Sequence, residues 1–155
     1  MLIGGTGAKN EILRTCSIHD LTKNSWIVGL PQMNKCRTGA SSCFLKGIVY
    51  VFAGFTGYAS KDGLSNSIEK IPEQSLVPGS KAVWDLIFVA LDVLTPCVSL
   101  AVAPLNNNEI VILGGWNNGA NTALGDVVIY DTKTKECHKS FSGELKFCTY
   151  SNQTV

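Results

Sequence analysis

The chain has 155 residues, of which 45% are hydrophobic and 16% are charged, and its net charge is +1. This composition supports a packed core and excludes a disordered polypeptide. A charge so close to neutral also argues against nucleic acid or an anionic membrane surface as the partner.

In chain order, the first signal is a short apolar strand, Met1 to Ile3, that runs into the pair Gly4–Gly5. The pattern recurs in residues 48–54 and 110–115, and the closing glycines Gly5, Gly54 and Gly115 are 49 and 61 residues apart. Such self-similarity near a period of about 50 residues is typical of a repeat architecture. It predicts repeated units, with an insertion in the second.

A pair of further strands follows each glycine pair. His19 and Trp26 are 7 residues apart, and so are Tyr130 and Cys137. In the middle unit, Trp84 follows residues 67–71 after a longer turn. Two spacings that agree between units predict four short strands per unit, at residues 39–45, 48–53, 66–71 and 83–90 in the middle one. Short runs of Val, Ile, Leu and Phe, broken by turn residues, favour an all-β fold over α/β.

The longest apolar run, Leu86 to Pro104, contains Asp92 and Pro96. We expect two buried strands broken at Thr95–Pro96, because a membrane span needs about 20 apolar residues with few or no charges. The N-terminus does not have the pattern of a signal peptide, and the six cysteines contain no CxxC pair. We therefore expect a cytoplasmic protein with free, buried thiols.

These features together resemble the kelch repeat family, whose pattern is a strand ending in Gly–Gly, a strand ending in Tyr–Asp, a turn, a Trp strand and a Pro–Met–Arg segment. The best-matching join runs from Trp26 through Pro31, Met33 and Arg37 to Tyr50, and Val98 lies near the place where Arg37 would recur. The positions that repeat between units are Gly4, Gly5, His19, Trp26, Ala53, Gly54, Ile71, Trp84, Gly114, Gly115, Tyr130 and Cys137.

The resemblance implies a partial kelch-type β-propeller of about three four-stranded antiparallel blades. Its units would be residues 1–35, 36–95 and 96–142, with 143–155 beginning a further blade, so we expect a fragment of a larger propeller. The residues expected to be buried are Trp26, Trp84, Tyr50, Tyr130, Ile112, Val51 and Phe52, with both tryptophans between adjacent sheets. Residues 151–155 and 2–5 would be neighbouring strands of one blade, and open edges of this kind predict self-association.

The residues show no catalytic centre, metal site or cofactor site. The two histidines fall at positions with structural roles, and residues 4–9 lack the spacing of a phosphate-binding loop. The resemblance implies a protein–protein interaction scaffold or adaptor, whose partner contacts the loops after the glycine pairs and the connections between blades. The candidate contact residues are Arg37, Tyr58, Lys61, Trp116, Asn117, Asn118 and Asn121.

Two alternatives remain open at this point. One is an enzyme resembling the copper oxidases that use the kelch fold, which would need a Cys, Tyr and His ligand set. The other is a truncated gene product without independent function.

Overall fold

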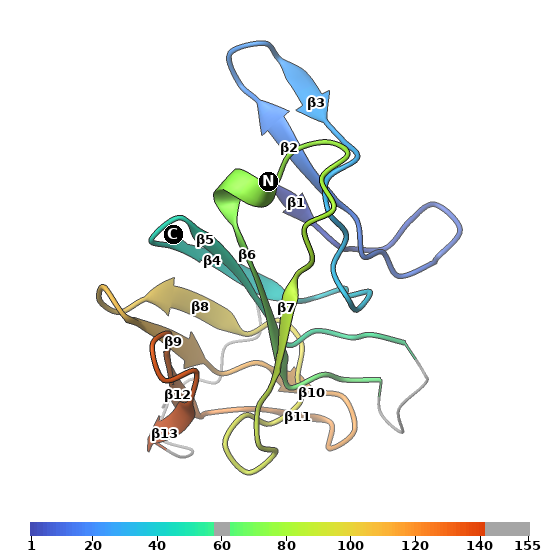
Figure 1. Cartoon of the computed structure of the whole chain (residues 1–155). Helices are drawn as coiled ribbons and strands as arrows, with labels where there is room; N and C mark the ends of the chain where they lie inside the picture. Colours follow the sequence, from blue (N-terminus) through green and yellow to red (C-terminus); the bar gives the residue numbers. More distant parts are fainter. Residues whose placement is uncertain (58–62, 142–155) are drawn as a thin grey trace.

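The computed structural model describes residues 1–57 and 63–141 (Figure 1). Three antiparallel sheets follow one another along the chain, and we call them the first, second and third sheets. The first contains β1 (Leu2–Ile3), β2 (Cys16–Asp20) and β3 (Ser25–Ile27). The second contains β4 (Ser41–Leu45), β5 (Ile48–Phe52), β6 (Ser67–Pro72) and β7 (Asp85–Phe88), with a 3-10 turn, η1 (Glu73–Ser75), after β6. The third contains β8 (Ala101–Pro104), β9 (Glu109–Leu113), β12 (Val127–Asp131) and β13 (Cys137–Phe141).

The all-β class with blade-like sheets is confirmed. The second and third sheets each have four strands in simple antiparallel order, whereas the first has three. The strand expected at residues 151–155 lies outside the described residues. A short hairpin, β10 (Trp116–Asn117) with β11 (Thr122–Ala123), was not expected. It continues the pairing of β9 with β12 beyond Gly114–Gly115.

The two glycine pairs and the equivalent pair Ala53–Gly54 have similar positive φ angles. The two φ angles are +62° and +104° at Gly4–Gly5, +55° and +94° at Ala53–Gly54, and +60° and +112° at Gly114–Gly115. Side chains disfavour these left-handed angles, which explains why glycine recurs here. Each pair bends the chain out of its strand and into the loop that follows.

Two separate cores lie between the sheets. The core between the first and second sheets contains Cys16, Leu30, Met33, Val49, Val51, Ile71, Leu76 and Trp84. The core between the second and third sheets contains Tyr50, Phe52, Ile68, Leu100, Val102, Ile110, Ile112, Val128 and Tyr130. The strands of the second sheet therefore supply one face to each core, as expected for sheets that pack face against face.

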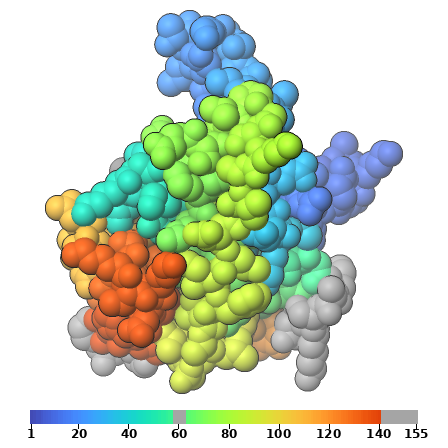
Figure 2. All heavy atoms as spheres, in the orientation of Figure 1, coloured from blue at the N-terminus to red at the C-terminus, as the bar shows by residue number. Residues whose placement is uncertain are grey.

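Trp84 is buried between sheets, as expected, and its indole Nε1 donates to the Pro31 carbonyl at 3.0 Å. The expectation for Trp26 was wrong, since 53% of this residue is exposed. The two tryptophans take equivalent places in their sheets, but only Trp84 has a packed segment over it. Among the described residues, no sheet lies on the corresponding side of the first one. The β2–β3 hairpin, blue in Figure 2, accordingly projects from the rest of the surface.

This difference predicts unequal costs for removing the two indoles. Trp84→Ala should lower the free energy of unfolding by about 3–5 kcal/mol, because it empties a buried wedge. Trp26→Ala should cost about 1 kcal/mol or less, because the ring already contacts water. Urea denaturation of both variants measures the two losses. Equal losses would mean that Trp26 is also buried between sheets in solution.

Candidate functional site

One end of the sheets is formed by two kinds of segment. The connectors are residues 28–40, between the first and second sheets, and 89–100, between the second and third. The glycine loops follow the glycine pairs, and their described residues are 6–14, 55–57, 63–65 and 116–125. Thr38 and Phe55 exchange two backbone hydrogen bonds of 2.9 and 2.8 Å. Val98 and Trp116 exchange two of 3.0 and 2.8 Å. Each connector is thereby paired with the glycine loop of the sheet that it enters.

The connectors also bond to the preceding sheet. The Gly5 amide donates to the Arg37 carbonyl at 2.7 Å, and the Gly54 amide donates to the Cys97 carbonyl at 2.9 Å. The two connectors contact each other through the Ser99 amide, which donates to the Gly39 carbonyl at 2.8 Å. Neighbouring sheets are thus joined by backbone hydrogen bonds at this end.

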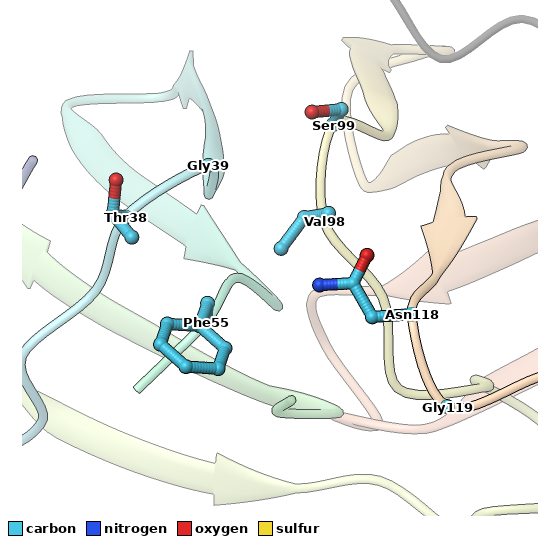
Figure 3. A pocket seen from close by; sticks show the side chains of 7 residues that line it. All are labelled: Thr38, Gly39, Phe55, Val98, Ser99, Asn118 and Gly119. Carbon is cyan, nitrogen blue, oxygen red and sulfur yellow. The ribbon is translucent and has the colours of Figure 1, made fainter. Parts of the chain in front are cut away.

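A pocket of about 500 Å³ opens where these segments meet. Its lining comes from both connectors and from two glycine loops: Thr38, Gly39, Phe55, Val98, Ser99, Asn118 and Gly119. Figure 3 shows the Val98 side chain and the Asn118 amide pointing into the space between the connectors, with the Phe55 ring to one side. This is the place where the sequence predicted a binding face, although only Asn118 of the pocket residues was among the candidates.

The polar groups of the pocket are only partly used by the protein. The Thr38 hydroxyl accepts a hydrogen bond of 3.2 Å from Thr6. Within the described residues, the Ser99 hydroxyl and the Asn118 side-chain amide have no hydrogen-bond partner. Two polar side chains are therefore free to bind a ligand.

The expectation that Arg37 lines the binding face was wrong. Arg37 is 1% exposed and points into the protein, where its Nε donates to Glu69 Oε1 at 3.1 Å and its Nη2 forms an ion pair with the same oxygen at 3.1 Å. Nη1 donates to the Ala53 and Ser67 carbonyls, and Nη2 also donates to the Ser67 hydroxyl at 2.7 Å. Each of the three guanidinium nitrogens therefore has a partner inside the protein. Burial lowers the pKa of Arg37, and the adjacent Glu69 carboxylate opposes that shift.

Glu69 is held with equal completeness, and it is fully buried. Its carboxylate accepts from the backbone amides of Asn34 at 2.6 Å and Lys35 at 3.1 Å, and from the Asn34 side chain at 3.0 Å. Asn34 and Lys35 belong to the first connector, whereas Glu69 belongs to β6. The ion pair and these hydrogen bonds therefore fix the first connector against the second sheet. Little in the sequence indicated this burial, because Glu69 is followed by Lys70 in a strand of mixed polarity.

The second connector replaces this ion pair with apolar contacts. The hydrogen bond from Gly54 places Cys97, rather than Val98, at the position equivalent to Arg37. The pairing of Ile112 with Val128 likewise places Val128 at the position of Glu69. Cys97 and Val128 are both buried in the core between the second and third sheets. The contact between a connector and the central strands of a sheet, which we call a joint, is thus made once with an ion pair and once with apolar side chains.

The remaining candidates divide into three groups. Asn117, partly exposed, donates from its side chain to the Pro96 carbonyl at 3.0 Å and accepts from the Ala120 amide, so it supports its own loop. Trp116 is partly exposed in β10, and Asn121 is exposed in the turn that closes the β10–β11 hairpin. Tyr58 and Lys61 lie outside the described residues.

The described part of the chain contains no group of three or more His, Cys, Asp or Glu side chains placed to hold a metal ion. Burial raises the pKa of the Cys97 thiol to about 12, and the Asp126 carboxylate adds to this shift. Cys97 is therefore a protonated core residue at neutral pH, with poor nucleophilicity. Within residues 1–57 and 63–141, no helix is both long and apolar enough to cross a membrane.

Comparison with known families gives one match, in which the Kelch motif covers residues 98–140. This segment is the third sheet with the end of its connector and its glycine loop. The first and second sheets have glycine pairs with φ angles similar to those of the third sheet, and the second sheet also has the same four-strand antiparallel order. No curated protein matches the chain.

The buried ion pair predicts strong coupling between its partners. Arg37→Met should cost about 3–5 kcal/mol of unfolding free energy, because it leaves the Glu69 charge buried without its cation. Adding Glu69→Gln removes that charge and keeps an acceptor for the connector amides. The loss of unfolding free energy in the double variant should therefore be smaller than the sum of the two single losses by about 1–3 kcal/mol. Additive losses in urea denaturation would show that the two side chains do not interact as described.

Proposed function

We propose that the chain is a protein-interaction module that binds its partner at the end formed by the connectors and glycine loops. The pocket between the second and third sheets is the observation that supports this proposal. It gathers a hydroxyl, an amide and an aromatic ring from segments far apart in the sequence. Polar groups that the fold leaves free, next to apolar surface, suit recognition of another protein.

We also propose that the chain is not an enzyme. The lining residues of the pocket include no His, Cys, Asp, Glu or Lys, so they offer no nucleophile–base pair. The loops that form the pocket are held by backbone hydrogen bonds to both neighbouring sheets. Such a rigid scaffold that presents short loops supports binding. A cytoplasmic location and self-association through sheet edges remain predictions from the sequence.

The proposal is tested by blocking the pocket. The exposed residue Asn118 is changed to Arg, and the exposed residue Thr134, in the turn between β12 and β13 at the other end of the third sheet, is changed to Arg as the control. Both changes add one positive charge. Partners captured from cell extract on the immobilised chain are identified by quantitative mass spectrometry.

We expect some proteins to bind both the unchanged chain and the Thr134→Arg variant. The amount of these proteins captured by Asn118→Arg should be at least about tenfold lower, because the arginine side chain fills the opening of the pocket. Circular dichroism serves to check that both variants are folded. Equal capture by all three chains would mean that the partner uses another surface.

A further inference from the structure

We propose that the pocket binds an uncharged polar segment of its partner, and that the Ser99 hydroxyl and the Asn118 amide form hydrogen bonds with this segment. This inference rests on the proposed function, since it names the chemistry of the partner at the same site. Three observations support it: the lining has no charged residue, Arg37 is bonded inside the protein, and Ser99 has a positive φ angle.

None of the seven described lining residues carries a charge. The arginine nearest to the pocket in sequence, Arg37, directly precedes the lining residue Thr38, but its guanidinium is buried and is bonded to groups inside the protein. An acidic segment would therefore lose its hydration in the pocket without gaining a cation, which is unfavourable. A basic segment would likewise find no carboxylate among these residues.

The pocket instead offers neutral hydrogen-bonding groups beside apolar surface. The Ser99 hydroxyl both donates and accepts, and the Asn118 amide can do the same with separate atoms. Phe55 and Val98 provide the apolar part of the lining. Side chains such as Ser, Thr, Asn and Gln, or an exposed peptide group, match the first pair of groups, and a flanking apolar residue matches the second.

Ser99 has an unusual backbone for a serine. Its φ angle is +55°, and the equivalent residue of the first connector is Gly39, with φ at +62°. Glycine adopts this conformation without strain, whereas serine does not. A glycine at this position would therefore satisfy the fold, and a serine side chain is not needed for it. The hydroxyl of Ser99 has no hydrogen-bond partner within the described residues. A strained residue with a free polar group in a pocket indicates a binding role.

Two substitutions separate the strain from the hydroxyl. Ser99→Gly relieves the strained backbone and removes the hydroxyl, so the melting temperature should rise by about 2–4 °C while binding weakens. Ser99→Ala keeps the strain and removes only the hydroxyl, so binding should weaken to the same extent without that rise. Loss of one hydrogen bond corresponds to about a 2- to 10-fold increase in Kd.

The probe is a random heptapeptide library displayed on phage and selected on the immobilised chain, followed by fluorescence polarisation of the enriched peptides. We expect uncharged peptides rich in Ser, Thr, Asn or Gln with a flanking apolar residue. Their Kd should change less than about twofold between 50 and 500 mM NaCl, because a neutral ligand is insensitive to screening. Ser99→Gly, Ser99→Ala and Asn118→Ala should each weaken them, whereas the control Thr134→Ala should not.

The failures of the two proposals differ. Enrichment of acidic or basic peptides that bind in a salt-dependent manner and are still lost with Asn118→Arg would overturn the uncharged ligand and leave the binding function intact. Peptides that bind equally well to all variants, or no enrichment above the blank support, would overturn the pocket as the binding site. Tight uncharged peptides that ignore both Ser99 substitutions would overturn the role given to Ser99.

Discussion

The arrangement of the sheets depends on the way each connector is bonded to two sheets at once. A backbone amide of the preceding glycine pair donates to the connector, and the connector then pairs with the glycine loop of the next sheet. Single sheets of two to four short strands bury too little surface to be stable alone, so this joint and the core beneath it hold the units together. The pocket is a direct consequence, since it lies where two such joints meet.

The two joints solve the same packing problem with different chemistry. The first uses the buried pair of Arg37 and Glu69, and the second uses Cys97 and Val128. A buried ion pair often contributes less stability than apolar packing of the same volume, but a wrongly placed neighbour would leave its charges unpaired. The charged joint therefore disfavours the packing of any segment other than the first connector against the second sheet. It also keeps the Arg37 guanidinium away from the pocket, although Arg37 directly precedes the lining residue Thr38, and this links the packing of the core to the chemistry of the pocket.

Much of the fold could be predicted from the sequence, because the glycine pairs and the spacing from His19 to Trp26 repeat in local sequence. The strands of the middle unit were placed within a few residues of β4 to β7. Burial at the joints could not be predicted in this way. Arg37 is buried because of Glu69, 32 residues further along the chain, and Trp26 is exposed because no described sheet covers it. Ser99 was missed because the sequence comparison aligned Val98 with Arg37. Only the structure aligns Cys97 with Arg37, which puts Ser99 at the position of Gly39.

Native-state hydrogen exchange tests the account most directly. If the connectors fix the sheets to one another, the amides of Gly54 and Ser99 should exchange as slowly as those of the β5–β6 ladder, since their bonds to Cys97 and Gly39 open only when neighbouring sheets separate. Exchange at these two amides as fast as at Lys81, an exposed residue before β7, would contradict the account. It would show that the sheets are joined through their apolar cores alone.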